Sequence, residues 1–268
     1  MARSPLGWLN LLLPGDRSGR LAESGIAYGD GLRRRLDVYV PRAAGSGPRP
    51  VLVFIYGGGW NSGVRADYSF AGRAFAALGF VTVVPDYRVV PEARFPGFVE
   101  DCAAALDWTR ANAARFDGDP ATIVLAGHSA GAYNAVMLGL DPAGFGASGP
   151  IRAVLGLSGP YDFYPFDMRE SIEAFAGVPD PAATQPVNLV TPAAPPMFLA
   201  HGTRDRIVAL RNSTALARRL EEAGVPVDLR VYPGLGHART LVDLMAPLRW
   251  RSTLWTDVTS FLQRVVPG

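Results

Sequence analysis

The chain has 268 residues, 49% of them hydrophobic, and its formal net charge is +2. This composition supports a sizeable apolar core, and the small net charge favours neither a nucleic-acid partner nor a strongly anionic substrate. Cys102 is the single cysteine, which excludes an intramolecular disulfide and a cysteine metal site. We interpret it as a small buried hydrophobic residue.

The first predicted element is a short amphipathic surface helix over Leu6 to Leu13. Its apolar run stops at Pro14-Gly15-Asp16, which is too early for a signal peptide, so secretion is the less favoured alternative. No stretch reaches transmembrane length. All 26 basic residues are arginine, which with the high alanine and glycine content suggests a GC-rich bacterial genome. We therefore expect a cytoplasmic bacterial protein.

Two strands are predicted over residues 22–28 and 32–40, with the turn signal Gly29-Asp30-Gly31 between them. The basic run Arg33-Arg34-Arg35 is interpreted as a solvated strand edge. A continuous apolar run over 51–55 indicates a strand buried on both faces. Further strands are expected at 80–84, 122–126, 153–157, 197–200 and 227–232, and helices at 67–78, 98–114, 132–138, 210–223 and 252–265.

This alternation of strands and helices predicts an α/β fold with a mostly parallel central sheet, an antiparallel leading hairpin and helices on both faces. Residues 160–195 interrupt the alternation with prolines and aromatic residues. Because this segment follows a strand at the carboxyl edge of the sheet, where such folds bind ligands, we interpret it as a small cap insertion. The whole chain, 1–268, is predicted to form one domain.

The pentapeptide Gly127-His128-Ser129-Ala130-Gly131 lies between a predicted buried strand and a helix. A G-x-S-x-G sequence in this position is the signature of a nucleophile elbow. The turn requires residues with almost no side chain two positions before and two after the serine. We expect Ser129 to adopt a strained conformation with its hydroxyl in open space.

A nucleophilic serine needs a histidine to accept its proton and a carboxylate to orient that histidine. The chain has three histidines. His128 is interpreted as pointing away from the serine's side of the elbow, and His201 precedes any suitable downstream acid. His237, after the last strand, is therefore the predicted base. Asp205, after the strand at 197–200, is the preferred acid, and Asp162 is its only serious rival.

The tetrahedral intermediate also needs backbone donors for its oxyanion. Ala130 begins the predicted elbow helix, where amide groups have no helical acceptor. A second donor is expected from the loop Gly57-Gly58-Gly59 after the strand at 51–55, because glycines let the backbone approach an oxygen atom closely. Separately, Asp86, Asp101 and Asp162 are interpreted as buried structural acids near loop backbones.

Together these motifs resemble the α/β-hydrolase fold carboxylesterases of the hormone-sensitive-lipase-like and arylformamidase-like esterase group. The resemblance covers the chain from about residue 25 onwards. It rests on the elbow and on the motifs at 57–60, 86–88, 91–92, 95–96, 201–205 and 236–237. It implies ester hydrolysis through an acyl-enzyme, with the amides of Gly58 and Gly59 joining that of Ala130. The cap lacks a long N-terminal helical extension, which favours the smaller formamidase-like and acetyl-esterase-like members.

One position departs from the pattern of the group, which usually has a histidine where this chain has Tyr56. The Tyr56 hydroxyl could brace the glycine loop as that histidine does, or it could reach the substrate. Trp60 and Tyr161 are, with Tyr56, the candidate substrate contacts at the carboxyl edge of the sheet.

We therefore predict a serine hydrolase acting on small carboxylic esters, with Ser129, Asp205 and His237 as its triad. Arylformamide hydrolysis is the alternative, followed by a hydroxynitrile lyase and a non-catalytic binding protein on the same fold. The expected partner is a small ester or arylamide, without a metal or organic cofactor and without nucleic acid. A monomer or a homodimer is expected.

Overall fold

The computed structural model describes residues 4–45 and 47–266. Its eight strands form one sheet in the order β1-β2-β4-β3-β5-β6-β7-β8. The strands are β1 (Gly19–Ala27), β2 (Arg35–Pro41), β3 (Arg49–Ile55), β4 (Val81–Pro85), β5 (Gly118–His128), β6 (Ala153–Leu157), β7 (Met197–Gly202) and β8 (Val227–Tyr232). The α-helices are α1 (Pro5–Leu12), α2 (Ser69–Ala77), α3 (Gly97–Asn112), α4 (Ala130–Leu140), α5 (Arg169–Ala174), α6 (Arg211–Glu222), α7 (Arg239–Val242) and α8 (Leu254–Val265).

The sheet has the mixed pairing that the sequence predicted. β2 pairs antiparallel with both β1 and β4, and the pairs from β4 through β3 to β8 are parallel. Strands β3, β4, β6 and β7 are buried along almost all their length, as expected for strands covered on both faces. The predicted fold class is confirmed.

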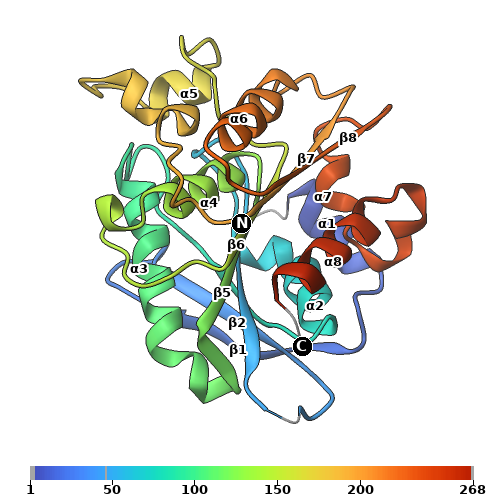
Figure 1. Ribbon diagram of the computed structural model, residues 1–268. Coiled ribbons are helices and arrows are strands. Elements are labelled where there is room, and N and C mark those ends of the chain that lie inside the picture. Colours follow the sequence, from blue (N-terminus) through green and yellow to red (C-terminus); the bar gives the residue numbers. More distant parts are fainter. Residues whose placement is uncertain (1–3, 46, 267–268) are drawn as a thin grey trace.

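Helices cover the two faces of the sheet in separate layers. Figure 1 shows α3 and α4 on one side of the sheet and α2 and α8 on the other. The amphipathic pattern of α6 is confirmed, because Leu216 and Leu220 are buried while Arg218 and Glu222 are exposed. Cys102 in α3 is also buried as predicted, and burial raises the pKa of its thiol.

The arginine run near the leading hairpin corrects the sequence interpretation. Arg35 is exposed at the start of β2, as interpreted, but Arg33 and Arg34 lie in the connection before β2, are partly buried and do not form a solvated strand edge. Arg34 forms an ion pair with the buried Asp101, 2.6 Å from its Oδ1, and Arg33 donates to three groups of the protein interior. A run of charged residues is interpreted as solvated from sequence alone because the groups that bind the side chains in the fold lie far away in the sequence.

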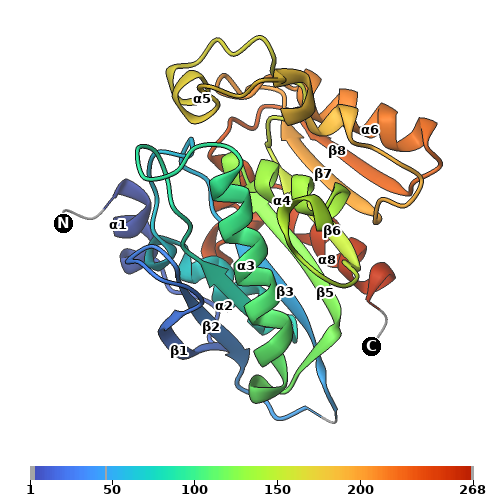
Figure 2. The same cartoon turned by 90° about the vertical axis from the view of Figure 1, so that its left-hand side faces the viewer.

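Residues 160–195 lie above the carboxyl edge of the parallel strands, with α5 at the top in both orientations (Figures 1 and 2). Two buried amides hold the start of this segment. The side-chain oxygen of Asn212 accepts from the N–H groups of Tyr161 and Asp162, and that of Gln185 accepts from Phe163 and Tyr164. The segment is thereby placed over the strand ends.

An aromatic cluster joins the 160–195 segment to the body of the protein. The ring of Phe175 makes edge contacts with Trp60 and Tyr133 and stacks on Phe166, with ring centroids 5.0–5.5 Å apart. Such pairs stabilise a fold beyond the apolar area that they bury. They also attach the segment to the glycine loop through Trp60.

The region between β8 and α8 was not predicted in detail. It contains α7 and a 3-10 helix, η6 (Ala246–Arg251). Both are too short for a helical period to appear in the sequence, and long-range contacts hold them. Arg249, for example, donates to both carboxylate oxygens of Asp16 at 2.8 Å. Across residues 4–45 and 47–266, none of the helices combines the length and the apolar character needed to cross a membrane.

Candidate active site

Ser129 lies at the tip of a tight turn between β5 and α4. Its φ of 56° and ψ of −125° put a non-glycine residue in a strained region of the backbone map. A Cβ on Gly127 would lie 2.3 Å from the carbonyl oxygen of Gly131, and one on Gly131 would lie 2.1 Å from that of Ile55. The expected need for side-chain-free positions around the serine is confirmed by these contacts.

The first turn of α4 begins directly after the serine. The N–H groups of Ala132 and Tyr133 donate to the Ser129 carbonyl oxygen at 2.9 and 3.1 Å, and the Ser129 N–H donates to Leu157 of β6. Ala130 is the first residue of the helix. The first N–H groups of an α-helix have no carbonyl acceptor within the helix, and the N–H of Ala130 is one of them. This amide is therefore available to a ligand beside the serine.

The glycine loop packs against the elbow. A Cβ on Gly57 would lie 2.7 Å from the His128 carbonyl oxygen and 2.9 Å from the Cβ of Ser129, so a larger residue has no room there. Gly58 and Gly59 have φ values of 137° and 57°, which glycine adopts without strain. Trp60 has a φ of 57° as well, although it carries a side chain.

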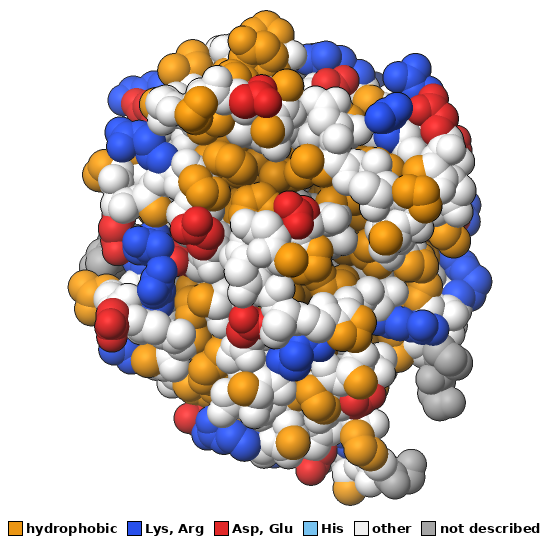
Figure 3. Space-filling model, turned by 60° about the vertical axis from the view of Figure 1, so that its left-hand side comes forward, with side chains coloured by type: hydrophobic (Ala, Val, Ile, Leu, Met, Phe, Trp, Pro, Cys, Tyr) orange, Lys and Arg blue, Asp and Glu red, His pale blue; other side chains and the backbone are white. Residues whose placement is uncertain are grey.

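The loop and the elbow border a cavity of about 860 Å³. The cavity lining includes seven predicted site residues: Gly58, Gly59, Trp60, Ser129, Ala130, Asp205 and His237. The segment above the sheet contributes Pro160, Phe163, Met168 and Glu170 to the same lining. Figure 3 shows hydrophobic side chains toward the middle of one face and basic side chains mainly around its margin, without a continuous basic patch.

Asp205 and His237 meet at the edge of this cavity. Nδ1 of His237 lies 2.8 Å from Oδ2 of Asp205, whose side chain is fully buried. The other carboxylate oxygen accepts from the N–H groups of Ile207 and Val208, both at 2.9 Å. Burial alone raises the pKa of Asp205, but hydrogen bonds from His201 and His237 outweigh it and bring the pKa well below its usual range. The carboxylate is therefore ionised at neutral pH.

His201 is a contact of Asp205 that the sequence analysis missed. Its Nε2 lies 3.3 Å from Oδ2 of Asp205 and 2.9 Å from the Val208 carbonyl oxygen, and its Nδ1 lies 2.8 Å from the Ser213 hydroxyl. The ring is fully buried. The i,i+4 spacing of His201 and Asp205 is the sequence signal that could have indicated this contact, whereas the order of residues along the chain bears only on whether His201 is the base.

His128 faces the loop that carries His237, a contact that the sequence analysis did not anticipate. Its Nε2 donates to the His237 carbonyl oxygen at 3.0 Å, and the two ring centroids are 4.8 Å apart. Burial, and after it the neighbouring His237, lowers the pKa of His128 to about 3. The ring is neutral at physiological pH and holds the backbone of the His237 loop.

The low pKa of His128 predicts that the protein loses stability in mild acid. The unfolded chain takes up a proton on this histidine below its ordinary pKa of 6.5, whereas the folded protein does not do so until about pH 3. The free energy of unfolding therefore falls as pH drops, by about 2 kcal/mol between pH 7 and pH 5 from this group alone.

Urea unfolding of the wild type and of His128→Gln at these two pH values measures the effect. The variant lacks the titrating group, so its stability should fall by about 2 kcal/mol less than that of the wild type over this interval. Equal losses in the two proteins would contradict the assignment of the low pKa to His128.

Two of the three predicted substrate contacts are not at the cavity surface. Among the described residues that line the cavity, Trp60 is present but neither Tyr56 nor Tyr161 is. Both tyrosines are fully buried. The Tyr56 ring stacks between Tyr68 and Tyr87, with centroids 5.0 and 4.9 Å away. The prediction that they contact substrate is therefore corrected.

The structure also shows which of the candidate acids contacts His237. Asp205 accepts the hydrogen bond from Nδ1 of His237. Asp162 makes no such contact: its N–H donates to Asn212, and the residue is half-buried, which corrects the expectation that it is buried. Asp86 and Asp101 are buried, as predicted. In residues 4–45 and 47–266, no group of three His, Cys, Asp or Glu side chains is arranged to hold a metal ion. The expected independence from metals and cofactors stays a prediction.

Comparison with known proteins places this geometry in a wider context. The profile of the family named BD-FAE matches residues 36–220. Esterase LipC of Mycobacterium tuberculosis is 32% identical over 242 residues, which cover 81% of this chain and 60% of that protein. Isoprenylcysteine alpha-carbonyl methylesterase ICME of Arabidopsis thaliana is 30% identical, with 88% and 61% of the two chains covered. The chain thus spans about 60% of the length of these relatives.

Solved structures share the fold at lower sequence identity. A truncated carbohydrate esterase from gut microbiota superposes with a TM-score of 0.82 at 22% identity, covering 94% of this chain and 98% of that one. An inhibited esterase B from Lactobacillus rhamnosis gives 0.81 at 19% identity, with 97% and 90% covered. With the sheet order described above, these similarities show the α/β-hydrolase fold that the motifs predicted.

Proposed function

The chain belongs to the BD-FAE family, and from this premise we propose that it is a serine hydrolase that cleaves small carboxylic esters through an acyl-enzyme. The observation that carries the proposal is the convergence on one cavity of a strained serine, a carboxylate-bound histidine and a glycine loop. The esterase names of the relatives in Mycobacterium and Arabidopsis support the same reaction class.

In the proposed reaction, Ser129 is the nucleophile and His237 is the general base. Because Nδ1 of His237 is engaged by Asp205, its Nε2 is the nitrogen left to accept the serine proton. The serine oxygen bonds to the ester carbonyl carbon as that proton moves to Nε2. The same proton then passes to the departing alcohol, and a water molecule, activated in the same way, releases the acid and restores the serine.

Asp205 orients the imidazole and stabilises its protonated form. Its second oxygen is held by two backbone N–H groups, and Oδ2 also lies near His201. These contacts fix the carboxylate before substrate arrives, so little reorganisation is needed during proton transfer. We assign His201 the role of orienting Asp205, because it contacts Asp205 and Val208 from behind and is not itself among the described residues that line the cavity.

The oxyanion is proposed to bind the amides of Ala130, Gly58 and Gly59. Ala130 supplies a free helix N-terminal amide beside the serine, and the two glycines border the same cavity. Loss of one such donor typically costs about 2.7–4 kcal/mol of transition-state stabilisation. The segment 160–195, which roofs the cavity, is proposed to act as a cap within a single domain.

A substrate panel tests the proposal. We expect the purified protein to hydrolyse p-nitrophenyl acetate and butyrate and to be labelled covalently by a fluorophosphonate probe. Hydrolysis of formanilide in the same panel tests the arylformamidase alternative, and cyanide release from mandelonitrile tests the lyase alternative. Inertness toward all of these compounds together with resistance to the probe would contradict hydrolase function and favour a binding protein. The cytoplasmic location and the monomeric or dimeric state stay predictions.

A further inference from the structure

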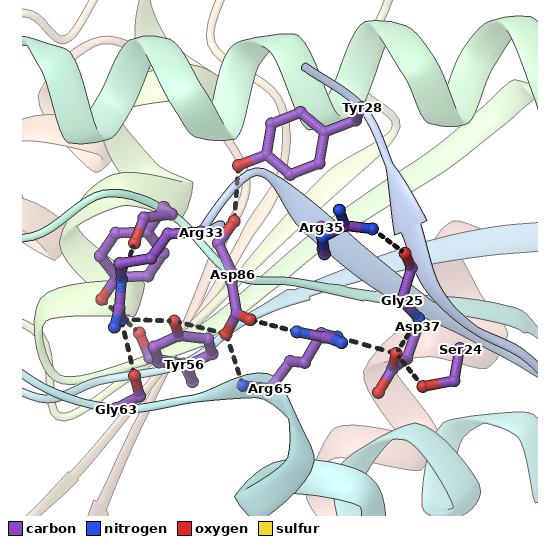
Figure 4. Close-up of polar contacts among 11 residues, drawn as sticks. Ser24, Gly25, Tyr28, Arg33, Arg35, Asp37, Tyr56, Gly63, Arg65 and Asp86 are labelled. Carbon is purple, nitrogen blue, oxygen red and sulfur yellow. Dashed lines mark hydrogen bonds and ion pairs between the residues drawn. The ribbon is translucent and has the colours of Figure 1, made fainter. Parts of the chain in front are cut away.

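A polar cluster contacts both ends of the glycine loop; two of its members are buried, two are partly exposed, and none of them lines the cavity. It consists of Tyr56, Asp86, Arg33 and Arg65, which we call the loop clamp (Figure 4). The Tyr56 hydroxyl donates to Oδ1 of Asp86 at 2.8 Å and accepts from the Arg33 guanidinium at 3.2 Å. Arg65 donates from its side chain to Oδ2 of Asp86. Each member therefore contacts at least one other member.

The clamp holds both ends of the segment that carries the glycines. Tyr56 directly precedes Gly57. At the other end, the Gly63 carbonyl oxygen accepts from Arg33 at 2.7 Å, and the Arg65 N–H donates to Oδ1 of Asp86 at 2.6 Å. Oδ1 of Asp86 thus accepts from Tyr56, directly before the loop, and from Arg65, two residues after Gly63. The two ends are tied to one carboxylate oxygen (Figure 4).

Further contacts make this arrangement rigid. A Cβ on Gly63 would lie 2.7 Å from the Tyr56 ring, so the end of the loop packs directly on that ring. The Tyr87 hydroxyl donates to the Tyr56 carbonyl oxygen at 2.9 Å, and Arg33 donates to the Tyr87 carbonyl oxygen. Arg65 also donates to Asp37, which pairs a second carboxylate with the second guanidinium and balances the charge of the cluster.

The protonation state of Tyr56 suits this role. Burial, and after it the negative charge of Asp86, raises the pKa of the Tyr56 hydroxyl well above its ordinary value. The hydroxyl therefore keeps its proton and can donate to Asp86. Buried polar groups that are fully paired favour one arrangement of the surrounding chain, whereas a partly paired group is costly.

The loop itself requires such support. Gly58 and Gly59 adopt their positive φ values without strain, but Trp60 has a positive φ with a large side chain. A strained backbone conformation persists only where surrounding contacts determine it strongly. Without the clamp, the backbone of Gly58 and Gly59, which borders the cavity, would have more conformations available.

We propose that Tyr56 is a positioning residue, which holds the amides of Gly58 and Gly59 in place for the oxyanion through its contacts with Asp86 and Arg33. This inference rests on the proposed ester hydrolysis. Tyr56 touches neither substrate nor the reacting atoms. Its effect is on the transition state, because the oxyanion forms only there, and ground-state binding of the ester is left nearly unchanged.

The test compares Tyr56→Phe with Tyr28→Phe. The Tyr28 hydroxyl donates to the backbone carbonyl oxygen of Asp86, so its removal also costs a tyrosine hydrogen bond to Asp86 but leaves the carboxylate contacts in place. For p-nitrophenyl butyrate, we expect Tyr56→Phe to lower kcat about 10- to 100-fold with KM changed less than about threefold. The rate of fluorophosphonate labelling should fall in parallel. We expect Tyr28→Phe to keep kcat within about twofold of the wild type.

A purely structural role makes a different prediction, namely that both variants lose thermal stability while kcat stays near the wild-type value. That outcome, or equal losses of kcat in the two variants, would overturn the proposal. If Tyr56→Phe does not fold, Arg33→Met carries the same expectation, because it removes the donors to Tyr56 and Gly63 from a partly exposed residue. An unchanged kcat in Arg33→Met would then overturn it. A wild type inactive toward all esters would instead refute the proposed function.

Discussion

Ser129→Ala is expected to abolish turnover of p-nitrophenyl butyrate, with kcat lowered about 10⁶-fold, to a level set by binding and the oxyanion donors alone. The hydroxyl is the only group at the elbow that can form the acyl-enzyme, and no other side chain occupies the strained tip between β5 and α4. The fold should be retained, because alanine adds no atom to the turn. Steady-state kinetics and fluorophosphonate labelling measure the loss.

Ser158→Ala is the matched control for this experiment. Ser158 also has a positive φ, follows the neighbouring strand β6, and loses one hydrogen bond, to Thr240, when it is replaced. Ser158 is not among the described residues that line the cavity, so the activity of Ser158→Ala should stay within about threefold of the wild type. Hydrolysis by Ser129→Ala above about one per cent of the wild-type rate, with labelling retained, would show that Ser129 is not the nucleophile.

Asp205→Asn is expected to lower kcat about 10⁴-fold while the fold is maintained. The asparagine amide has nearly the shape of the carboxylate, but its NH₂ group can meet Nδ1 of His237 only if that nitrogen carries no proton. The proton then lies on Nε2, which can no longer accept the serine proton. The charge that stabilises the imidazolium is also lost, although the N–H groups of Ile207 and Val208 keep an acceptor.

The pH dependence of stability offers a second measurement on the same variant. Because the pKa of Asp205 is lowered on folding, its charged form stabilises the native state above the carboxylate's ordinary pKa, and this contribution is lost as pH falls. Asp205→Asn should therefore be less stable than the wild type at pH 7, with the difference shrinking in acid.

Asp162→Asn, at the rival acid, should leave kcat within about twofold of the wild type. A large loss of kcat there with none in Asp205→Asn would reverse the assignment.

Much of the fold was predictable because its signals are local. Strand β6 has the predicted bounds, and β7, β8 and α6 begin within a residue of their predicted positions, since apolar runs and helical periodicity reflect burial on two faces or on one. The elbow was found for the same reason. Its glycines are required by backbone contacts within one short turn, so the requirement is visible in five consecutive residues.

The surroundings of the histidines were not predictable in this way. His128 and His201 both proved to contact the Asp205–His237 pair, through partners 109 residues away in one case and four in the other. Elimination by chain order identified a candidate base but could not show what the remaining histidines do. Hydrogen bonds between loops at separate strand ends have no periodic signal in the sequence.

Tyr56 is a second residue whose contacts could not be predicted from the sequence. The sequence by itself determined that a tyrosine stands before the glycine loop, that the loop carries no side chains over three residues, and that its strand leads to the carboxyl edge of a parallel sheet. Only the tertiary structure showed that the Tyr56 hydroxyl meets Asp86 and Arg33 and that Tyr56 is not among the described residues lining the cavity. The reason is physical: the hydroxyl's direction depends on Asp86, Arg33 and Arg65, which three different connections bring together at the ends of the loop. Local patterns determine which face a residue buries, whereas the partner that a buried polar group finds is determined by how the elements pack.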